Sequence, residues 1–174
     1  MIDFSLPGWM SPAELIWLYE TSRHMQSIVE VGSYKGRTTH PLCKGCQGLV
    51  FTIDNFMLPF GDDMVIKDPD PTALYKEFYK NVGHFKNLVI FRTDSEVAAQ
   101  FFKPKSIDMI FIDAGHEKDD LLKDLKAWLP ICKKLICGHD LQPAYPGIEL
   151  ALKEMNINYS FVVGSIWKHE IISQ

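Results

Sequence analysis

The sequence predicts an α/β fold: a doubly wound, mostly parallel sheet with helices on both faces. Short apolar runs alternate along the chain with segments that have helical spacing, as βαβ units do. Polar residues stand at the ends of five consecutive apolar runs. In a parallel sheet these ends meet at one edge, where ligands bind. Seven strands are expected, at residues 28–31, 49–53, 88–91, 107–112, 134–137, 159–163 and 165–172.

The last two strands are expected to pair with each other. Gly164 stands between them and permits a tight return, so the final strand should be antiparallel in a sheet whose first five strands are parallel. Helices are expected at 11–24, 37–42, 71–82, 95–102, in the Leu121–Leu129 region and after Pro146.

Composition sets limits on function. The 174 residues suit one domain, 1–174, and 47% apolar with 23% charged residues is ordinary for a soluble globular protein. A net charge of −4 gives no reason to expect a nucleic-acid partner. No apolar run has the length of a membrane span, and the first residues do not read as a signal peptide. We therefore expect no membrane association and a cytoplasmic location.

Two segments have a local signature. Ser11-Pro12-Ala13-Glu14 predicts a capping box with proline in the first turn of a helix, and Met10 and Leu15 are placed to form its hydrophobic staple. The polar insertion at 56–72 is unusually long for a compact domain, and it is a candidate lid.

The four cysteines raise the question of zinc. Cys43 and Cys46 have the spacing of one half of a zinc site, but Cys132 and Cys137 do not supply a matching half. We expect free thiols.

A glycine turn after the first strand predicts a nucleoside site. Glu30, Gly32, Ser33 and Gly36 form the turn, and Asp54 follows the second apolar run. The glycines let backbone N–H groups approach a ligand, and a carboxylate at this distance accepts hydrogen bonds from ribose hydroxyls. The third glycine of the dinucleotide pattern is missing, so a ligand without a pyrophosphate is favoured.

The later strand ends carry a second group of polar residues. Asp94 and Ser95 follow the third strand, Asp113 and His116 the fourth, and His139 and Asp140 the fifth. The fourth and fifth strands are expected to be neighbours, so Asp113, His116, His139 and Asp140 should converge on one spot. Because side chains alternate along a strand, we expect at most one of His139 and Asp140 to point straight in, and we favour Asp140.

These residues resemble a known family. The turn from Glu30 to Gly36 looks like the first motif of class I S-adenosylmethionine-dependent methyltransferases. The stretch from 107 to 140 and the closing residues 164–167 are similar to a small-molecule O-methyltransferase branch. That branch includes macrocin-type sugar methyltransferases and cephalosporin-hydroxylase-like proteins. The resemblance covers about residues 27–167 and implies a Rossmann-like sheet of strand order 3-2-1-4-5-7-6.

The resemblance implies a role for each matching position at the cofactor. Glu30, with the backbone of Gly32 and Ser33, would hold the methionine end of S-adenosylmethionine, and Gly36 would close the turn. Asp54 would bind the ribose. At the remaining end, Asp94 and the backbone of Ser95 would meet the adenine, and Asp113 would lie beside the cofactor.

The resemblance also implies a catalytic group. Asp113, His139 and Asp140 match the positions at which metal-dependent members bind a divalent ion, and His116 matches a general base. Metal-dependent members have an acid or an amide where this chain has His139. Because magnesium prefers oxygen ligands, a histidine at this position allows a softer divalent ion.

The function expected is therefore methyl transfer to a hydroxyl of a small-molecule acceptor. Two alternatives are a non-catalytic cofactor-binding protein of the same fold and a nicotinamide-dependent oxidoreductase, against which the missing glycine counts. Nothing in the sequence indicates the acceptor or the oligomeric state.

Overall fold

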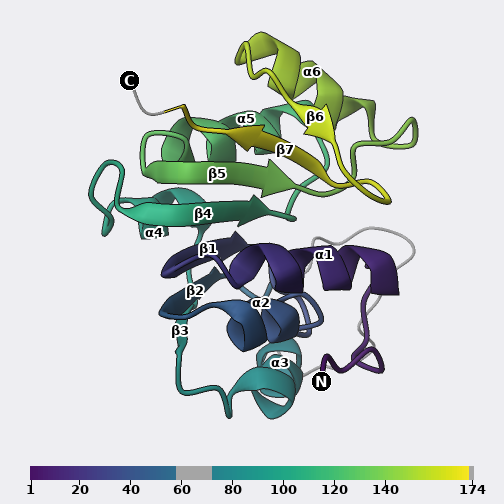
Figure 1. The fold of residues 1–174 in the computed structure, drawn as a ribbon, viewed down its shortest axis with the longest axis vertical. Helices are drawn as coiled ribbons and strands as arrows, with labels where there is room; N and C mark the ends of the chain where they lie inside the picture. The colour runs from purple at the N-terminus through teal and green to yellow at the C-terminus, as the bar shows by residue number, and fades with distance from the viewer. Residues whose placement is uncertain (58–71, 173–174) are drawn as a thin grey trace.

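The strands form one seven-stranded sheet in the computed structural model, which describes residues 1–57 and 72–172 (Figure 1). The strand order is β3-β2-β1-β4-β5-β7-β6. The first five strands are parallel, and β7 is antiparallel to both β5 and β6. The predicted fold class and strand order are confirmed. The strands are β1 Ser27–Val31, β2 Leu49–Ile53, β3 Leu88–Phe91, β4 Ile107–Ile112, β5 Cys132–Gly138, β6 Ser160–Phe161 and β7 Trp167–Glu170.

Helices cover both faces of this sheet, with α1 to α3 on one face and α4 to α6 on the other (Figure 1). Each face has its own buried apolar cluster, so residues that alternate along β1 and β4 are divided between the two. The helices are α1 Pro12–Ser22, α2 Thr39–Gly45, α3 Ala73–Val82, α4 Ser95–Ala99, α5 Lys118–Trp128 and α6 Pro146–Glu154.

The first helix begins at the predicted capping box. Ser11 and Glu14 each bond to the other's backbone N–H, and Pro12 occupies the first turn. Leu15 and Leu18 are fully buried against the sheet. The helix ends at Ser22, two residues before the predicted end.

The residues before α1 are held on the protein by one side chain. The Arg37 guanidinium donates to the carbonyl oxygens of Met10 at 2.8 Å and Phe4 at 2.9 Å, and to that of Leu6. Arg37, which was predicted to begin the second helix, therefore lies before it and fixes the N-terminal segment.

Other boundaries differ from the prediction for local reasons. Gly36 has a φ of +86°, which delays the start of α2 to Thr39. β6 has two residues instead of five, while β5 begins at Cys132, two residues early. Residues 58–71 of the insertion predicted at 56–72 lie outside the described residues, so the lid stays a prediction.

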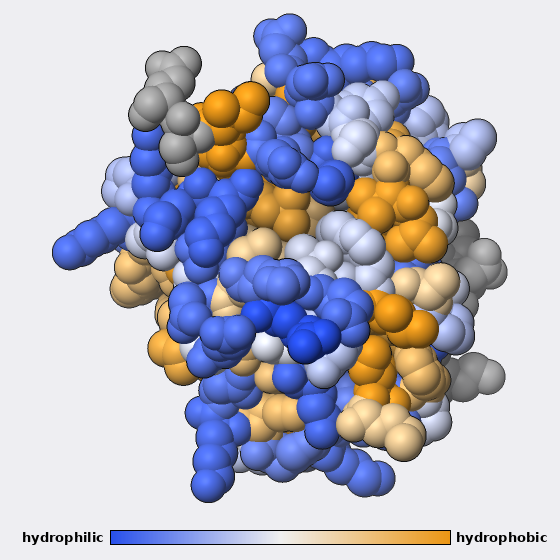
Figure 2. Space-filling model, viewed as in Figure 1, coloured by the Kyte–Doolittle hydropathy of each residue, from blue (hydrophilic) through white to orange (hydrophobic). Residues whose placement is uncertain are grey.

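The four cysteines lie in the interior, and the surface is mixed in polarity (Figure 2). Cys43, Cys46, Cys132 and Cys137 are free and buried, as expected. Figure 2 shows a face on which hydrophilic residues separate several apolar patches. None of the helices among the described residues is long and apolar enough to cross a membrane.

Candidate functional site

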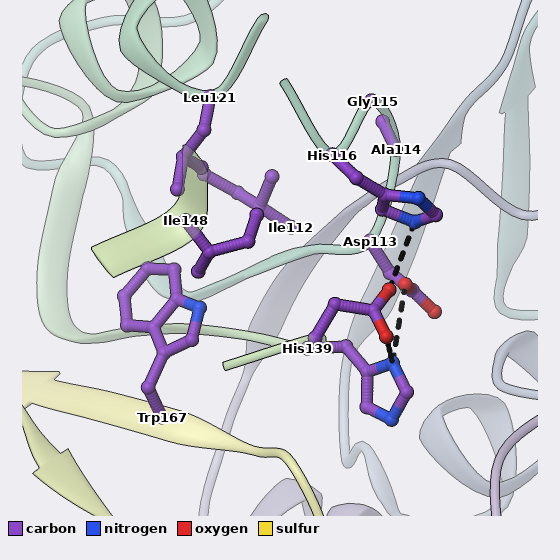
Figure 3. A pocket seen from close by; sticks show the side chains of 10 residues that line it. Ile112, Asp113, Ala114, Gly115, His116, Leu121, His139, Ile148 and Trp167 are labelled. Atoms are coloured by element: carbon purple, nitrogen blue, oxygen red, sulfur yellow. Dashed lines mark ion pairs between the residues drawn. The ribbon is translucent and has the colours of Figure 1, made fainter. Parts of the chain in front are cut away.

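Three potential ligand residues meet beyond the ends of β4 and β5. Asp113 directly follows β4, and His139 and Asp140 directly follow β5. The two strands are paired so that Ile112 lies opposite Gly138, which brings the following residues to the same level. One oxygen or nitrogen atom from each of Asp113, His139 and Asp140 lies within 4.8 Å of the others. The sheet thus builds a compact group of two carboxylates and an imidazole (Figure 3).

The expectation that only one of His139 and Asp140 points inward is wrong. Both belong to the group, and their side chains touch each other, with His139 Nδ1 at 3.2 Å from Asp140 Oδ1. Alternation applies within a strand, but β5 ends at Gly138. Asp140 then adopts a left-handed φ of +61°, which turns the chain and returns its carboxylate to the same side.

His116 joins the group through Asp140. Its Nε2 lies 2.8 Å from Asp140 Oδ2, and its ring contacts Tyr145 with 4.4 Å between ring centroids. The hydrogen bond to Asp140 raises the pKa of His116. With 42% of its side chain exposed, His116 is the member of the group most open to a ligand.

His139 lies between carboxylates on both sides of its ring. Nδ1 faces Asp140 and lies 3.6 Å from Asp113 Oδ1, while Nε2 lies 3.0 Å from Glu14 Oε1. Burial lowers the pKa of His139. The hydrogen bond to Asp140 and the charges of Asp113, Asp140 and Glu14 outweigh burial and raise this pKa to about 9.

The two acids respond to their surroundings in opposite directions. Burial and the nearby Asp140 charge raise the pKa of Asp113 to about 6, although His139 acts against this. Burial also acts to raise the pKa of Asp140, but hydrogen bonds from His116 and His139 outweigh it and hold that pKa well below its ordinary value. Asp140 therefore stays ionised at lower pH than Asp113 does.

A cavity of about 10 Å³ adjoins the group, which is about the space of one water molecule. His116, Asp113 and His139 lie on one side of it, and Ile148 and Trp167 lie on the other (Figure 3). Trp167 Nε1 is the one buried side-chain nitrogen or oxygen of the described residues without a hydrogen-bond partner. An oxygen atom held in this cavity would satisfy that donor.

The glycine turn lies directly beside Asp113. Gly32 has a φ of +84°, and a Cβ atom there would lie 2.1 Å from the carbonyl oxygen of Asp113. No other residue type fits this approach without a backbone shift. The site of the expected cofactor and the acidic group are therefore in direct contact through the backbone.

Asp54 is already bonded to this turn. Its Oδ2 accepts the backbone N–H groups of Ser33 at 2.8 Å and Tyr34 at 2.9 Å, and its Oδ1 accepts that of Phe56 at 2.6 Å. Tyr34 has a φ of +47°, so a left-handed residue takes the position of the missing glycine. Oδ1 has one accepting position left for a ligand hydroxyl.

Glu30 lies beneath the turn, with none of its surface exposed. Its carboxylate accepts the hydroxyls of Thr38 at 2.5 Å, Thr39 at 2.6 Å and Thr52 at 2.8 Å. Burial raises the pKa of Glu30 to about 7, and the three hydroxyls act against this rise. In this structure Glu30 joins β1 to α2 and β2 and has no exposed surface.

Asp94 and Ser95, which follow β3, contact different parts of the protein. Asp94 is exposed, and its Oδ1 accepts Nδ2 of Asn55 at 2.9 Å. Ser95 Oγ instead accepts the indole N–H of Trp128 at 2.7 Å. The Ser95 side chain is thus used within the protein, and only its backbone remains for a ligand.

The sequence did not identify four residues as part of the site: Glu14, Tyr145, Ser165 and Trp167. Glu14 was explained by its capping box, and its contact with His139 spans 125 residues, so no local pattern could show it. Ser165 and Trp167 lay in a motif that carried no assigned role. Tyr145 precedes the proline that begins α6, and that proline was the only signal near it.

Comparison with known proteins agrees with this arrangement. A family model described as a methyltransferase domain matches residues 29–141, which is well over half of the chain. This segment includes the glycine turn, Asp54, Asp113, His116, His139 and Asp140. No curated protein matches the sequence at a significant level.

Solved structures share the fold at low sequence identity. An S-adenosylmethionine-dependent O-methyltransferase from Thermotoga maritima is 11% identical, with a TM-score of 0.67 over 98% of this chain and 69% of that one. An O-methyltransferase from Bacillus cereus in complex with SAH is 18% identical, with a TM-score of 0.65 over 95% and 84%.

A third structure shows that the fold alone does not fix the reaction. A precorrin 8w decarboxylase from Methanobacterium thermoautotrophicum is 12% identical, with a TM-score of 0.66 over 98% of this chain and 96% of that one. The family match, in contrast, covers the strand ends that carry the site. The chain therefore belongs to the methyltransferase domain family and is an S-adenosylmethionine-dependent methyltransferase.

Proposed function

We propose that this methyltransferase transfers the methyl group to a hydroxyl of a small molecule, assisted by a divalent metal ion and by His116 as general base. The observation that carries the proposal is the meeting of Asp113, His116, His139 and Asp140 beside the glycine turn. An unactivated hydroxyl is a weak nucleophile, so transfer to it needs a group that removes the proton and one that orients the oxygen. This group of residues offers both functions.

Asp140 supports the two functions with different oxygens. Its Oδ2 pairs with His116 Nε2 at 2.8 Å, and its Oδ1 faces His139 Nδ1 at 3.2 Å. A carboxylate only accepts hydrogen bonds, so His116 Nε2 carries the hydrogen and Nδ1 is the basic atom. The raised pKa of His116 makes Nδ1 a stronger proton acceptor for the hydroxyl.

The donor set of Asp113, His139 and Asp140 fits a divalent cation. Two carboxylates and one imidazole suit a first-row transition-metal ion, such as Mn²⁺, Fe²⁺ or Co²⁺, better than Mg²⁺, which prefers oxygen ligands alone. When bound, such an ion lowers the pKa of a hydroxyl that it touches. Trp167 Nε1, without a partner on the cavity wall, is placed to donate to an oxygen held there.

The cofactor is expected to lie along the turn. Asp54 Oδ1 would accept from the ribose, the backbone of Gly32 and Ser33 would adjoin the methionine end, and Asp94 and the Ser95 backbone would adjoin the adenine. Glu30 would act by holding the turn through its threonines. The narrower likeness to macrocin-type and cephalosporin-hydroxylase-like proteins supports a small hydroxylated acceptor, and it stays a prediction.

Turnover with labelled S-adenosylmethionine against a panel of hydroxylated small molecules tests this function. The proposal predicts methyl transfer that a chelator abolishes and Mn²⁺ restores, with S-adenosylhomocysteine affinity unchanged. His116→Ala should lower kcat about 10²–10⁴-fold. His24→Ala, which changes an exposed histidine beyond α1, is the matched control. Full activity after exhaustive chelation would rule out a role for the metal ion. Full activity of His116→Ala as well would rule out the whole proposed mechanism.

A further inference from the structure

Glu14 occupies an unusual position for a helix-capping residue. Only 4% of it is exposed, although a capping box works equally well at the surface. A buried carboxylate is costly unless each of its oxygens is hydrogen-bonded. Both oxygens of Glu14 have such partners.

The capping box uses only one of the two oxygens of Glu14. Oε2 accepts the backbone N–H and the hydroxyl of Ser11, both at 2.7 Å. Oε1 accepts the backbone N–H of Ser165 at 2.9 Å and lies 3.0 Å from His139 Nε2. The second oxygen thus reaches from α1 to the residue after β5.

The loop between β6 and β7 is shaped around this carboxylate. Gly164 has a φ of +61°, and a Cβ atom there would lie 2.0 Å from Glu14 Oε1. Ser165, the next residue, donates its N–H to Oε1, and its hydroxyl lies 2.9 Å from His139 Nε2. Two distant segments of the chain therefore enclose the contact between Glu14 and His139.

The contact with Glu14 fixes a hydrogen on one ring nitrogen of His139. Glu14 can only accept, so His139 Nε2 must carry a hydrogen. Asp140 also only accepts, so Nδ1 donates to it while no metal ion is bound. A metal ion that displaces this hydrogen would take the lone pair of Nδ1, and Nε2 would keep its hydrogen on Glu14. Nδ1 is the atom that faces Asp140 at 3.2 Å and Asp113 at 3.6 Å.

We propose that Glu14 is a positioning residue for a divalent metal ion, because it holds His139 with Nε2 protonated and Nδ1 directed toward Asp113 and Asp140. The inference rests on the metal assistance proposed above. Carboxylates that orient a ligating histidine in this way typically contribute 10–100-fold to metal affinity. Glu14 does this from the first turn of a helix far away in the sequence.

Glu14→Gln separates the two roles of this residue. Glutamine also closes a capping box, in which its amide oxygen accepts from Ser11. Its amide nitrogen then faces His139 Nε2 and the N–H of Ser165. All three groups are donors, so they cannot hydrogen-bond to one another. His139 can relieve this only by moving its hydrogen to Nδ1, which removes the lone pair from the metal side.

The experiment is calorimetric titration of Mn²⁺ and Co²⁺ into the parent, Glu14→Gln and Ser11→Ala. We expect Glu14→Gln to bind each ion 10–100-fold more weakly. Ser11→Ala removes the cap and leaves the carboxylate beside His139, so it should lower Tm by about 2–4 °C and bind the ions like the parent. Asp113→Ala gives the effect of losing a ligand itself.

A second measurement needs no variant. In the Zn²⁺-loaded parent, long-range ¹H–¹⁵N NMR of the histidine rings should show the His139 hydrogen on Nε2. A hydrogen on Nδ1, or equal affinity of the parent and Glu14→Gln, would overturn the role of Glu14 and leave the metal site standing. A parent that binds none of the three ions would overturn the metal site, and this inference with it.

Discussion

Single residues in this site carry more than one interaction each. Asp140 places one oxygen on His116 and the other on His139, and Glu14 divides its oxygens between Ser11 and His139. Charges buried in this way are stabilised only while every partner is present. Substitutions at the residue scale should therefore change protonation as well as contacts, and Glu30 allows the clearest test.

Glu30→Gln should flatten the dependence of stability on pH. The pKa of Glu30 is raised from 4.5 in its ordinary state to about 7 in the fold. Below pH 4.5 both states hold the proton, so the full stability is present. Between 4.5 and about 7 the folded state holds a proton that the unfolded state has released, so the free energy of unfolding falls as pH rises, by up to about 1.4 kcal/mol per pH unit.

Urea unfolding of the parent and Glu30→Gln from pH 4 to 8 measures this effect. The glutamine can still bond the three threonine hydroxyls, which are able to donate or accept. Glu20→Gln, at an exposed position on α1, is the control for the loss of one charge. If the curves of the parent and Glu30→Gln run parallel through this window, Glu30 does not hold a proton in the fold.

At this scale the sequence predicted the residues that follow the strands, but not the contacts that depend on local backbone conformation or on packing between distant segments. The sequence predicts site residues after the strands, because a parallel sheet brings these positions to one edge. These residues are Asp54, Asp113, His116, His139 and Asp140. The inward position of both His139 and Asp140 could not be predicted, since it depends on the left-handed backbone of Asp140. The contact of Glu14 with His139 depends on how α1 packs on the sheet, which no local pattern reports.

At the scale of elements, the turn between β1 and α2 is held by an acid from another strand. Asp54, after β2, accepts the N–H groups of Ser33 and Tyr34. Local signals predicted α1 well because a capping box fixes a helix start within four residues. They predicted α2 and β6 less well, because the start of α2 depends on a left-handed glycine and the length of β6 on its pairing with β7.

Asp54→Ala should weaken binding of S-adenosylhomocysteine at least tenfold. The change removes an acceptor for the ribose and also the anchor of the turn, and hydrogen bonds to a charged group contribute about 1.5–3 kcal/mol each. Calorimetry measures the affinity. Glu20→Ala, at an exposed position on α1, is the control and should bind as the parent does. Unchanged affinity of Asp54→Ala would contradict the ribose role.

At the scale of the whole molecule, strand order decides which residues meet. β1 and β4 are neighbours in the sheet although β2 and β3 lie between them in the sequence, and β5 pairs with β4. The cofactor turn and the acidic group are therefore neighbours, and α1 crosses the same face as α2 and brings Glu14 to the ends of the strands (Figure 1). The alternation of strands and helices predicted a mostly parallel sheet, Gly164 predicted the antiparallel last strand, and the family resemblance implied the strand order, all of which the structure has.

The mechanism proposed above requires a divalent ion between Asp113, His139 and Asp140, beside the cofactor. A crystal structure of the protein with S-adenosylhomocysteine and Mn²⁺, recorded with anomalous data at the manganese edge, tests it most directly. We expect an anomalous peak within coordination distance of His139 Nδ1 and of oxygens from Asp113 and Asp140, with the cofactor along the Gly32 turn. A bound cofactor with no peak between these three residues would contradict it.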